Sequence, residues 1–240
     1  MNSSPEIHIS VVYDNLSLQD TLRADWGLSF FIHGLEKTIL FDSGADGRIL
    51  LANMEYLGLH PKTIDAVVLS HEHKDHTGGL RTLLKRNRDL DVYIPSTFSK
   101  AIKKSIQQCG GRYVEIQGQE EICKQAFSSG VIHGWIPEQS LVLKTQKGFV
   151  LMTGCAHPRI VKIINQVKNL FHKTPFLVMG GFHLAGFSRP ELQEIIGFFQ
   201  SSKIGKVGPC HCTGEEAREM FQEAYGSSFI DIGVGKEIIL

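Results

Sequence analysis

Residues 69–80, LSHEHKDHTGGL, place three histidines and an aspartate within six positions. His71, His73, Asp75 and His76 come directly after an apolar run and directly before a Gly-Gly pair. Imidazole and carboxylate groups are ligands that suit zinc, iron and manganese. Because side chains two residues apart point the same way along a strand, His71 and His73 can face one ion. The spacing predicts half of a metal site rather than a histidine-rich loop without metal.

Other residues must complete such a site. His157 in TGCAHPRI and His211 in PCHCTG both lie where loops are expected near the same sheet edge. His133 in GVIHGW is the alternative to His157 as the third histidine for the first ion. Cys155 could bind metal as a thiolate or pack as a small apolar residue. We therefore expect His157 and His211 as ligands, with Cys155 as a further candidate.

Three residues are expected to support the chemistry around the metal. Asp42 in LFDSG could accept the second N–H of a metal-bound imidazole, or it could form an Asx turn. His183, directly after Phe182 in GGFHL, is placed to contact substrate or donate a proton. Asn15, at the end of the first predicted strand, is a candidate substrate contact.

The remaining cysteines and histidines near these motifs are expected to be structural. Cys210 and Cys212 flank His211, so the alternation of a strand predicts that both point away from it and pack. The histidines for which a structural role is expected are His8, His33, His60 and His172.

Short apolar runs alternate with amphipathic stretches along the chain. Strands are predicted at 7–15, 28–34, 37–44, 64–70, 92–95, 141–146, 149–154 and 176–184. Helices are predicted at 48–59, 78–87, 97–110, 159–170 and 190–200, a strand and a helix within 206–226, and several short strands within 112–140. This order predicts one layered α/β domain over residues 1–240, with helices outside and sheets inside. The candidate residues fall at strand carboxyl ends, where open sheets place ligand sites.

The composition narrows the class of partner. Lys+Arg and Asp+Glu number 25 each, so the formal net charge is zero and a nucleic-acid or anionic-membrane partner is not expected. The N-terminus MNSSPEIHIS lacks a secretory pattern, and no apolar run is long enough to span a membrane. Five cysteines, an odd number, then favour reduced thiols and a cytoplasmic location.

SHEHKDHTGGL resembles the H-x-H-x-D-H signature of the metallo-β-lactamase superfamily, and ILFDSG resembles its preceding aspartate motif. GLSFFI, TGCAHPRI, GGFHL, PCHCTG and GVGK, in this order, are similar to motifs of the dihydropteroate-synthase-like branch. That branch includes a synthase group of methanopterin biosynthesis, which joins a dihydropterin to an aminobenzene ribofuranosyl phosphate. The resemblance covers about residues 7–240 and implies a four-layer αβ/βα sandwich with metal at the sheet edge.

The resemblance also implies a set of ligands. The residues implied for metal 1 are His71, His73 and His157, and those for metal 2 are Asp75, His76 and His211. The superfamily often has a bridging aspartate where this chain has Cys155, so one or two divalent ions are expected. Zinc is the expected metal, with iron and manganese as alternatives. The branch commonly shows glycine and tyrosine where this chain has Glu72 and Lys74, which are expected to alter the mouth of the site.

The expected function is that of a metal-dependent hydrolase acting on an ester, phosphoester or related small molecule. A metal-bound hydroxide would attack the acyl or phosphoryl centre, with Asp75 orienting it and His183 donating a proton. The alternative is a transferase that condenses a pterin diphosphate with an aminobenzene compound. A redox di-iron protein and a metal-binding module without turnover are two further classes.

Overall fold

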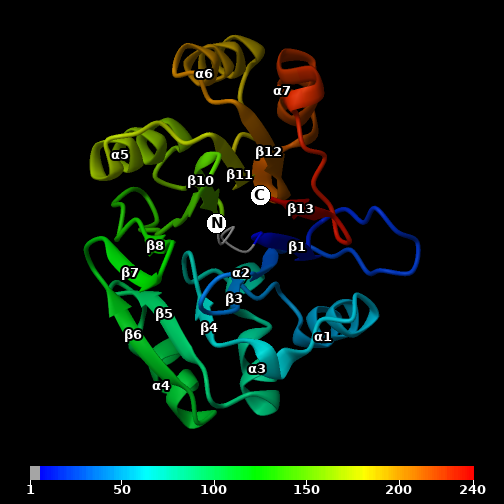
Figure 1. Ribbon diagram of the computed structural model, residues 1–240, viewed down its shortest axis with the longest axis vertical. Helices are drawn as coiled ribbons and strands as arrows, with labels where there is room; N and C mark the ends of the chain where they lie inside the picture. The colour runs from blue at the N-terminus through cyan, green and yellow to red at the C-terminus, as the bar shows by residue number, and fades with distance from the viewer. Residues whose placement is uncertain (1–5) are drawn as a thin grey trace, which may run out of the picture.

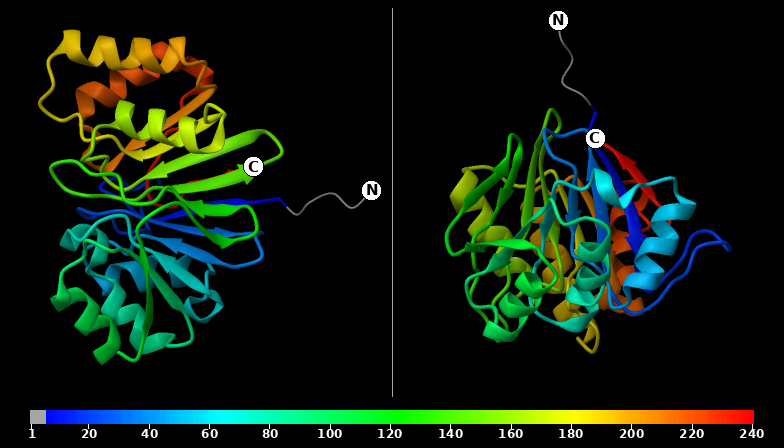
Figure 2. Two further views of the ribbon diagram at one scale, coloured as in Figure 1. Left: turned by 90° about the vertical axis from the view of Figure 1, so that its left-hand side faces the viewer. Right: turned by 90° about the horizontal axis from the view of Figure 1, so that it is seen from below.

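The computed structural model describes residues 6–240 of the protein. Two β-sheets pack face to face, and helices cover the outer face of each (Figures 1 and 2). The turned view in Figure 2 shows these as four layers, helices, sheet, sheet and helices. The α/β class and the four-layer αβ/βα sandwich are thereby confirmed.

Within residues 6–240 the first sheet has seven strands, in the order β13-β1-β2-β3-β4-β5-β6. Their bounds are β1 His8–Tyr13, β2 Ser29–His33, β3 Ile39–Phe41, β4 Ala66–Val68, β5 Asp91–Pro95, β6 Arg112–Ile116 and β13 Glu237–Ile239. The expected hairpin of β2 and β3 is antiparallel, with Phe31 opposite Leu40. From β3 to β6 the neighbouring strands are parallel, so these strands carry their carboxyl ends to one edge.

The second sheet has six strands in the same described range, in the order β12-β11-β10-β9-β8-β7. Their bounds are β7 Glu120–Cys123, β8 Ala126–Ser128, β9 Leu141–Thr145, β10 Gly148–Thr153, β11 Leu177–Gly181 and β12 Lys206–Cys210. The predicted hairpin of β9 and β10 is present, with Thr145 paired to Gly148 across the turn. β10, β11 and β12 run parallel, so their carboxyl ends also meet at one edge.

The helices pack by their apolar faces on the outer sides of the sheets. Those on the first sheet are α1 Gly47–Tyr56, α3 Leu80–Arg86 and α4 Lys100–Gln108; those on the second are α5 Ile160–Phe171, α6 Arg189–Ser201 and α7 Glu215–Tyr225. The single turn α2 Lys74–Thr77 has no apolar residue and belongs to the segment between β4 and α3. Short 3₁₀ turns are η1 Pro61–Thr63, η2 His211–Thr213 and η3 Gly226–Ser228. No helix within residues 6–240 has the length and apolar character needed to cross a membrane.

Strand β10 shows why apolar runs form both sheets. Val150 and Met152 face the core between the sheets, whereas Leu151 packs on Ile163 of α5 in the outer core. Because both faces of this strand are covered, its sequence is continuously apolar instead of alternating. Full burial of such a side chain stabilises the folded state by about 1.5–3 kcal/mol. The two cores therefore fix β10 between the facing sheet on one side and α5 on the other.

Candidate metal centre

Three histidines from two elements of the fold converge at the sheet edge. His71 and His73 follow β4, and His157 follows β10; one ring nitrogen of each lies within 4.8 Å of the other two. The His157 ring centroid is 4.5 Å from that of His71 and 4.9 Å from that of His73. His71 and His157 are buried and His73 is exposed. We call these three residues the tri-histidine group.

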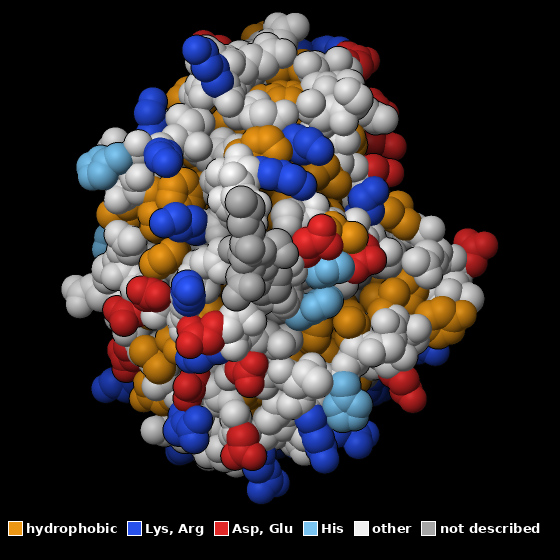
Figure 3. Space-filling view, viewed as in Figure 1, with side chains coloured by type: hydrophobic (Ala, Val, Ile, Leu, Met, Phe, Trp, Pro, Cys, Tyr) orange, Lys and Arg blue, Asp and Glu red, His pale blue; other side chains and the backbone are white. Residues whose placement is uncertain are grey.

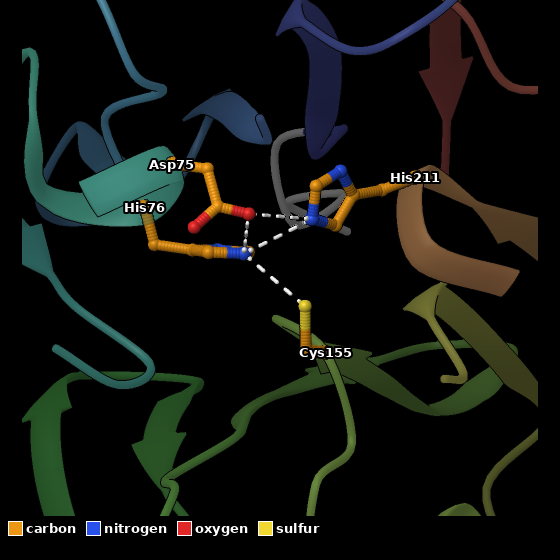
Figure 4. Close-up of side chains that lie close together, drawn as sticks. All are labelled: Asp75, His76, Cys155 and His211. Carbon is orange, nitrogen blue, oxygen red and sulfur yellow. Dashed lines mark hydrogen bonds and ion pairs between the residues drawn. The ribbon is translucent and has the colours of Figure 1, made fainter. Parts of the chain in front are cut away.

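A second set lies beside the first and is called the mixed group: Asp75, His76, Cys155 and His211 (Figure 4). Asp75 Oδ2 is 3.2 Å from His211 Nε2 and 3.5 Å from His76 Nε2. Cys155 Sγ is 3.3 Å from His76 Nε2, which is 3.1 Å from His211 Nε2. The structure therefore brings the six predicted histidine and aspartate ligands, and Cys155, into two adjacent groups.

The backbone of the first motif is fixed by its neighbours. α2 begins at Lys74, and its single turn carries Asp75 and His76 toward the centre. The N–H of Leu28 donates to Asp75 O at 3.2 Å, and the N–H of Ser43 donates to His76 O at 2.8 Å. The loops after β1 and β3 thus hold the segment that carries Asp75 and His76 from both sides.

Asp42 supports two imidazoles at once. Its Oδ2 accepts from His76 Nδ1 at 2.7 Å and from the Ser70 hydroxyl at 2.7 Å. Since the Ser70 hydroxyl hydrogen is used on Asp42, its oxygen accepts from His71 Nδ1 at 2.9 Å. His71 and His76 each then carry their neutral-state proton on Nδ1, which leaves Nε2 free to bind a cation. The support role proposed for Asp42 fits this geometry, and the Asx-turn alternative does not.

Glu138 and Asn15 support the other two buried imidazoles. Glu138 Oε2 accepts from His157 Nδ1 at 3.1 Å, and Asn15 Oδ1 accepts from His211 Nδ1 at 3.0 Å. Asn15 also donates from Nδ2 to His211 O and accepts from the N–H of Gly27. Asn15, a candidate substrate contact, is half-buried, and its side-chain amide holds His211 through both its oxygen and its nitrogen.

The ring nitrogens at the centre are suited to a cation. Burial and the neighbouring imidazoles hold the pKa of His71 well below its usual range, and its buried Nε2 has no hydrogen-bond partner among residues 6–240. Burial alone lowers the pKa of His76, but the Asp42 carboxylate outweighs it and raises the pKa to about 10. Asp75 stays ionised because hydrogen bonds from His211 and His76 overcome burial and lower its pKa. The neutral His71 imidazole, the anionic Asp75 carboxylate and a His76 ring whose surroundings favour positive charge together suit a divalent cation, which would take the place of the His76 proton on Nε2.

Glu138 is a residue that the sequence did not point to. Its carboxylate is fully buried and accepts four backbone N–H groups, those of residues 154–157, besides the His157 ring. Glu138 follows Trp135 and precedes β9 in WIPEQS, a stretch with no pattern to distinguish it from a surface loop. A buried carboxylate with five donors fixes both the TGCAH loop and the tautomer of His157.

Gly154 occupies a point where the chain has no room for a side chain. A Cβ there would lie 2.0 Å from Ser70 Oγ and 3.1 Å from Asp42 Oδ2. Glycine at this position therefore lets the TGCAH loop approach the Asp42–Ser70 hydrogen bonds closely enough to bring Cys155 and His157 to the centre.

Backbone conformation is unusual at three of the predicted site residues. Asp42, His183 and His211 have positive φ angles of 58°, 53° and 51°. Non-glycine residues enter this region rarely and at a cost of about 1–3 kcal/mol, and such residues concentrate at functional sites. In each of the three, the chain has just left a strand end, so the turn aims the side chain at the sheet edge.

His133 does not join either group. Its side chain is exposed, and its backbone carbonyl accepts from Lys162 Nζ. His157, the preferred third histidine, lies in the tri-histidine group instead.

Cys210 and Cys212, which flank His211, lie in different surroundings. Cys210 is buried in the core between the sheets, as expected. Cys212 is also buried, as expected, but its Sγ lies with Cys155 and His183 in a third cluster whose candidate ligand atoms are within 4.8 Å of one another. The strand ends at Cys210 and η2 starts at His211, so strand alternation no longer determines where Cys212 points.

His183 lies at the open side of the centre. Its ring centroid is 4.6 Å from that of His157, and the side chain is exposed. A hydrogen bond to Cys212 raises the pKa of His183. Of the two charged residues expected at the mouth, Glu72 accepts the N–H of Ser99 at the start of α4, and Lys74 is exposed.

The other histidines lie apart from the centre. His60 Nδ1 accepts the N–H of Lys62 and thereby caps η1, and His172 ends α5. His8 and His33 stack across β1 and β2 with ring centroids 4.7 Å apart, and His8 pairs with an exposed glutamate of β13.

Asp14 is a buried carboxyl group close to His211, and its burial should make the stability of the protein depend on pH. Its side chain is 1% exposed, Oδ1 accepts the N–H of Leu16, and Oδ2 has no hydrogen-bond partner in the described part of the chain. Burial raises the pKa of Asp14 to about 6 from an ordinary 3.8. The folded state thus holds the proton more tightly than the unfolded state, so stability falls as pH rises from about 4 to 6 and stays low above that.

We expect Asp14→Asn to remove this loss. The variant should match the wild type near pH 4 and exceed it at pH 8 by about 3 kcal/mol in unfolding free energy. Urea unfolding at both pH values, with EDTA present, measures this. Asp20→Asn, at an exposed aspartate, is the matched control. Equal pH dependence in Asp14→Asn and the wild type would refute the burial argument.

Comparison with known proteins places the candidate ligands within a known family of metal-dependent proteins. The family model of the metallo-beta-lactamase superfamily matches residues 27–163, more than half of the chain. The chain belongs to the metallo-beta-lactamase superfamily. This matched range contains the tri-histidine group and all of the mixed group except His211, which lies beyond it.

Relatives within the superfamily span nearly the whole chain. The 7,8-dihydropterin-6-methyl-4-(beta-D-ribofuranosyl)-aminobenzene-5'-phosphate synthase of Methanocaldococcus jannaschii is 30% identical, over 88% of this chain and 89% of that protein. The crystal structure of a metal-dependent hydrolase of the beta-lactamase superfamily has a TM-score of 0.81 and 26% identity, covering 97% of this chain and 98% of that one. The metallo-beta-lactamase fold protein YhfI from Bacillus subtilis, at 12% identity and a TM-score of 0.72, shares the fold, with 98% of this chain and 99% of that one covered.

Metallo-beta-lactamase superfamily members usually bind divalent metals, and the two candidate ligand groups here lie where such a site is expected. Membership in an enzyme superfamily, together with a relative named as a synthase, supports an enzymatic role.

Proposed function

We propose that this protein is a metal-dependent hydrolase that cleaves an ester or phosphoester bond in a small molecule, using two divalent ions. The observation that carries the proposal is the pair of adjacent ligand groups, in which four buried imidazoles are each held through Nδ1 and turn Nε2 to the centre. Zinc is the metal proposed, because a thiol from Cys155 joins imidazole and carboxylate ligands in the mixed group.

The residues of the two ligand groups and His183 would have different roles in the reaction. The tri-histidine group would hold one ion and the mixed group the other. When bound, such ions polarise a substrate oxygen and lower the pKa of water, which is the chemistry that hydrolysis needs. Asp75 spans His76 and His211 and is held ionised, so it would bind metal and orient water. His183, exposed beside His157 with its pKa raised, is the proposed proton donor to the leaving group.

A transferase is the second candidate, supported by the synthase relative that matches most of both chains. It would condense a pterin diphosphate with an aminobenzene compound at the same centre. The two reactions differ in the nucleophile, an aromatic amine in the transferase and water in the hydrolase.

An isotope experiment separates the two. The zinc-loaded protein is incubated in ¹⁸O-labelled water with 4-nitrophenyl phosphate, bis(4-nitrophenyl) phosphate or 4-nitrophenyl acetate, and separately with a dihydropterin diphosphate and 4-aminobenzoate. We expect hydrolysis with one ¹⁸O atom in the acid product. A C–N condensation product without ¹⁸O in the pterin would establish the transferase, and intact substrates throughout would refute the hydrolase.

The surface charge supports a small-molecule substrate rather than nucleic acid. The formal net charge is zero, and on the face that Figure 3 shows, basic and acidic side chains are interspersed. The cysteines, all in the described part of the chain, are free thiols, which supports the proposed cytoplasmic location.

A further inference from the structure

The two tryptophans of the chain are both exposed. Trp26 is 57% exposed and Trp135 is 84% exposed. Tryptophan has a large apolar surface that folding normally covers, so an exposed indole is informative when it stands beside a reactive site.

Trp26 stands next to the mixed group. Its ring centroid is 4.9 Å from that of His211, with a tilt of 50°. Its backbone is held on both sides: the N–H of Trp26 donates to Asp25 Oδ1, and the next N–H, of Gly27, donates to Asn15 Oδ1. Asp25 in turn accepts from the hydroxyl of the fully buried Tyr13. This loop is therefore anchored to the same Asn15 that holds His211.

Trp135 stands next to the tri-histidine group. Its ring centroid is 6.4 Å from that of His157, at an angle of 70°. The loop that carries it packs closely on the segment after His157, since a Cβ on Gly134 would lie 2.6 Å from Pro158 Cα. Three residues further on, buried Glu138 fixes the chain.

Each half of the sandwich thus presents one exposed indole beside one ligand group. Indole faces stack on flat rings and discriminate against saturated rings of the same size, which cannot lie flat. Within residues 6–240 neither tryptophan belongs to a buried core cluster, and an indole is not a metal ligand, so neither role explains why these side chains stand at the centre.

We propose that Trp26 and Trp135 bind a planar aromatic or heteroaromatic group of the substrate, next to the bond that the metal centre cleaves. This inference rests on the proposed function, because it names the substrate class of the same centre. It restricts the small-molecule substrate to compounds with a flat ring near the ester or phosphoester group.

The test compares ligands that differ only in planarity and are not turned over. Phenylphosphonate and cyclohexylphosphonate carry the same charged group and the same number of ring carbons. Isothermal titration into zinc-loaded wild type should give a Kd about tenfold lower for the phenyl compound. Benzoate and cyclohexanecarboxylate repeat the comparison for carboxyl substrates.

Trp26→Leu and Trp135→Leu should each reduce this preference several-fold. Tyr56→Leu, at an aromatic residue 60% exposed at the end of α1, is the matched control and should keep it. Equal affinity for flat and saturated rings, no binding of either pair, or a full preference in both tryptophan variants would overturn the inference. Because the ligands are not cleaved, a preserved preference in a protein that hydrolyses nothing would refute the proposed function but still support flat-ring binding by Trp26 and Trp135 beside the metal centre.

Discussion

The Asp75→Asn variant is expected to lose about a thousandfold in kcat/KM with the ester or phosphoester that the wild type cleaves. Asp75 Oδ2 lies 3.2 Å from His211 Nε2 and 3.5 Å from His76 Nε2 and is the carboxylate of the mixed group. Asparagine keeps the shape but removes the negative charge. A lost metal interaction is worth several kcal/mol of transition-state stabilisation, which corresponds to this factor.

Steady-state kinetics with 4-nitrophenyl phosphate or 4-nitrophenyl acetate measure the effect, alongside the zinc content of each preparation. Asp89→Asn makes the same chemical change at an exposed position and should leave kcat/KM unchanged. Activity of Asp75→Asn within tenfold of the wild type would show that the mixed group does not take part in the reaction.

The Glu138→Gln variant is expected to lose about 3 kcal/mol in unfolding free energy. One carboxylate oxygen of Glu138 accepts the N–H of His157 and its ring Nδ1–H. If the glutamine NH₂ takes that place, donor faces donor in a buried site and two N–H groups lose their acceptor. Each such loss costs about 1–3 kcal/mol. We also expect zinc affinity to fall by about 10–100-fold, because the His157 tautomer is no longer fixed.

Urea unfolding in EDTA gives the stability change, and competition with a zinc chelator gives the affinity. Glu219→Gln, at an exposed glutamate of α7, is the matched control and should change neither. A Glu138→Gln protein as stable as the wild type would mean that the buried carboxylate does not hold the TGCAH loop.

Much of the fold could be predicted because its elements carry local signals. The apolar run before His71, the Gly110 end of α4 and the β9–β10 turn are each determined by neighbours in sequence. Gly110 has a φ of +81°, the left-handed conformation that a glycine C-cap supplies. The ligand residues could be predicted because a metal site requires a restricted set of residue types at strand ends.

The supporting residues could not be predicted in the same way, because their roles depend on long-range contacts. Glu138 reaches residues 154–157 only after β9 and β10 pair. Asn15 meets His211, 196 positions away, through the closure of the two sheets. The direction of the Cys212 side chain could not be predicted from strand alternation, because the strand ends at Cys210 and a 3₁₀ turn begins at His211.

The most direct test of the central claim is the metal content per chain. Protein is produced without a metal-binding tag, loaded with zinc, freed of excess and analysed by elemental mass spectrometry beside a His71→Ala, His73→Ala double variant. Two adjacent ligand groups predict two equivalents of zinc in the wild type and the loss of at least one in the variant. Wild type that retains no metal, or a variant that retains as much as the wild type, would contradict the assignment of this site as a metal centre.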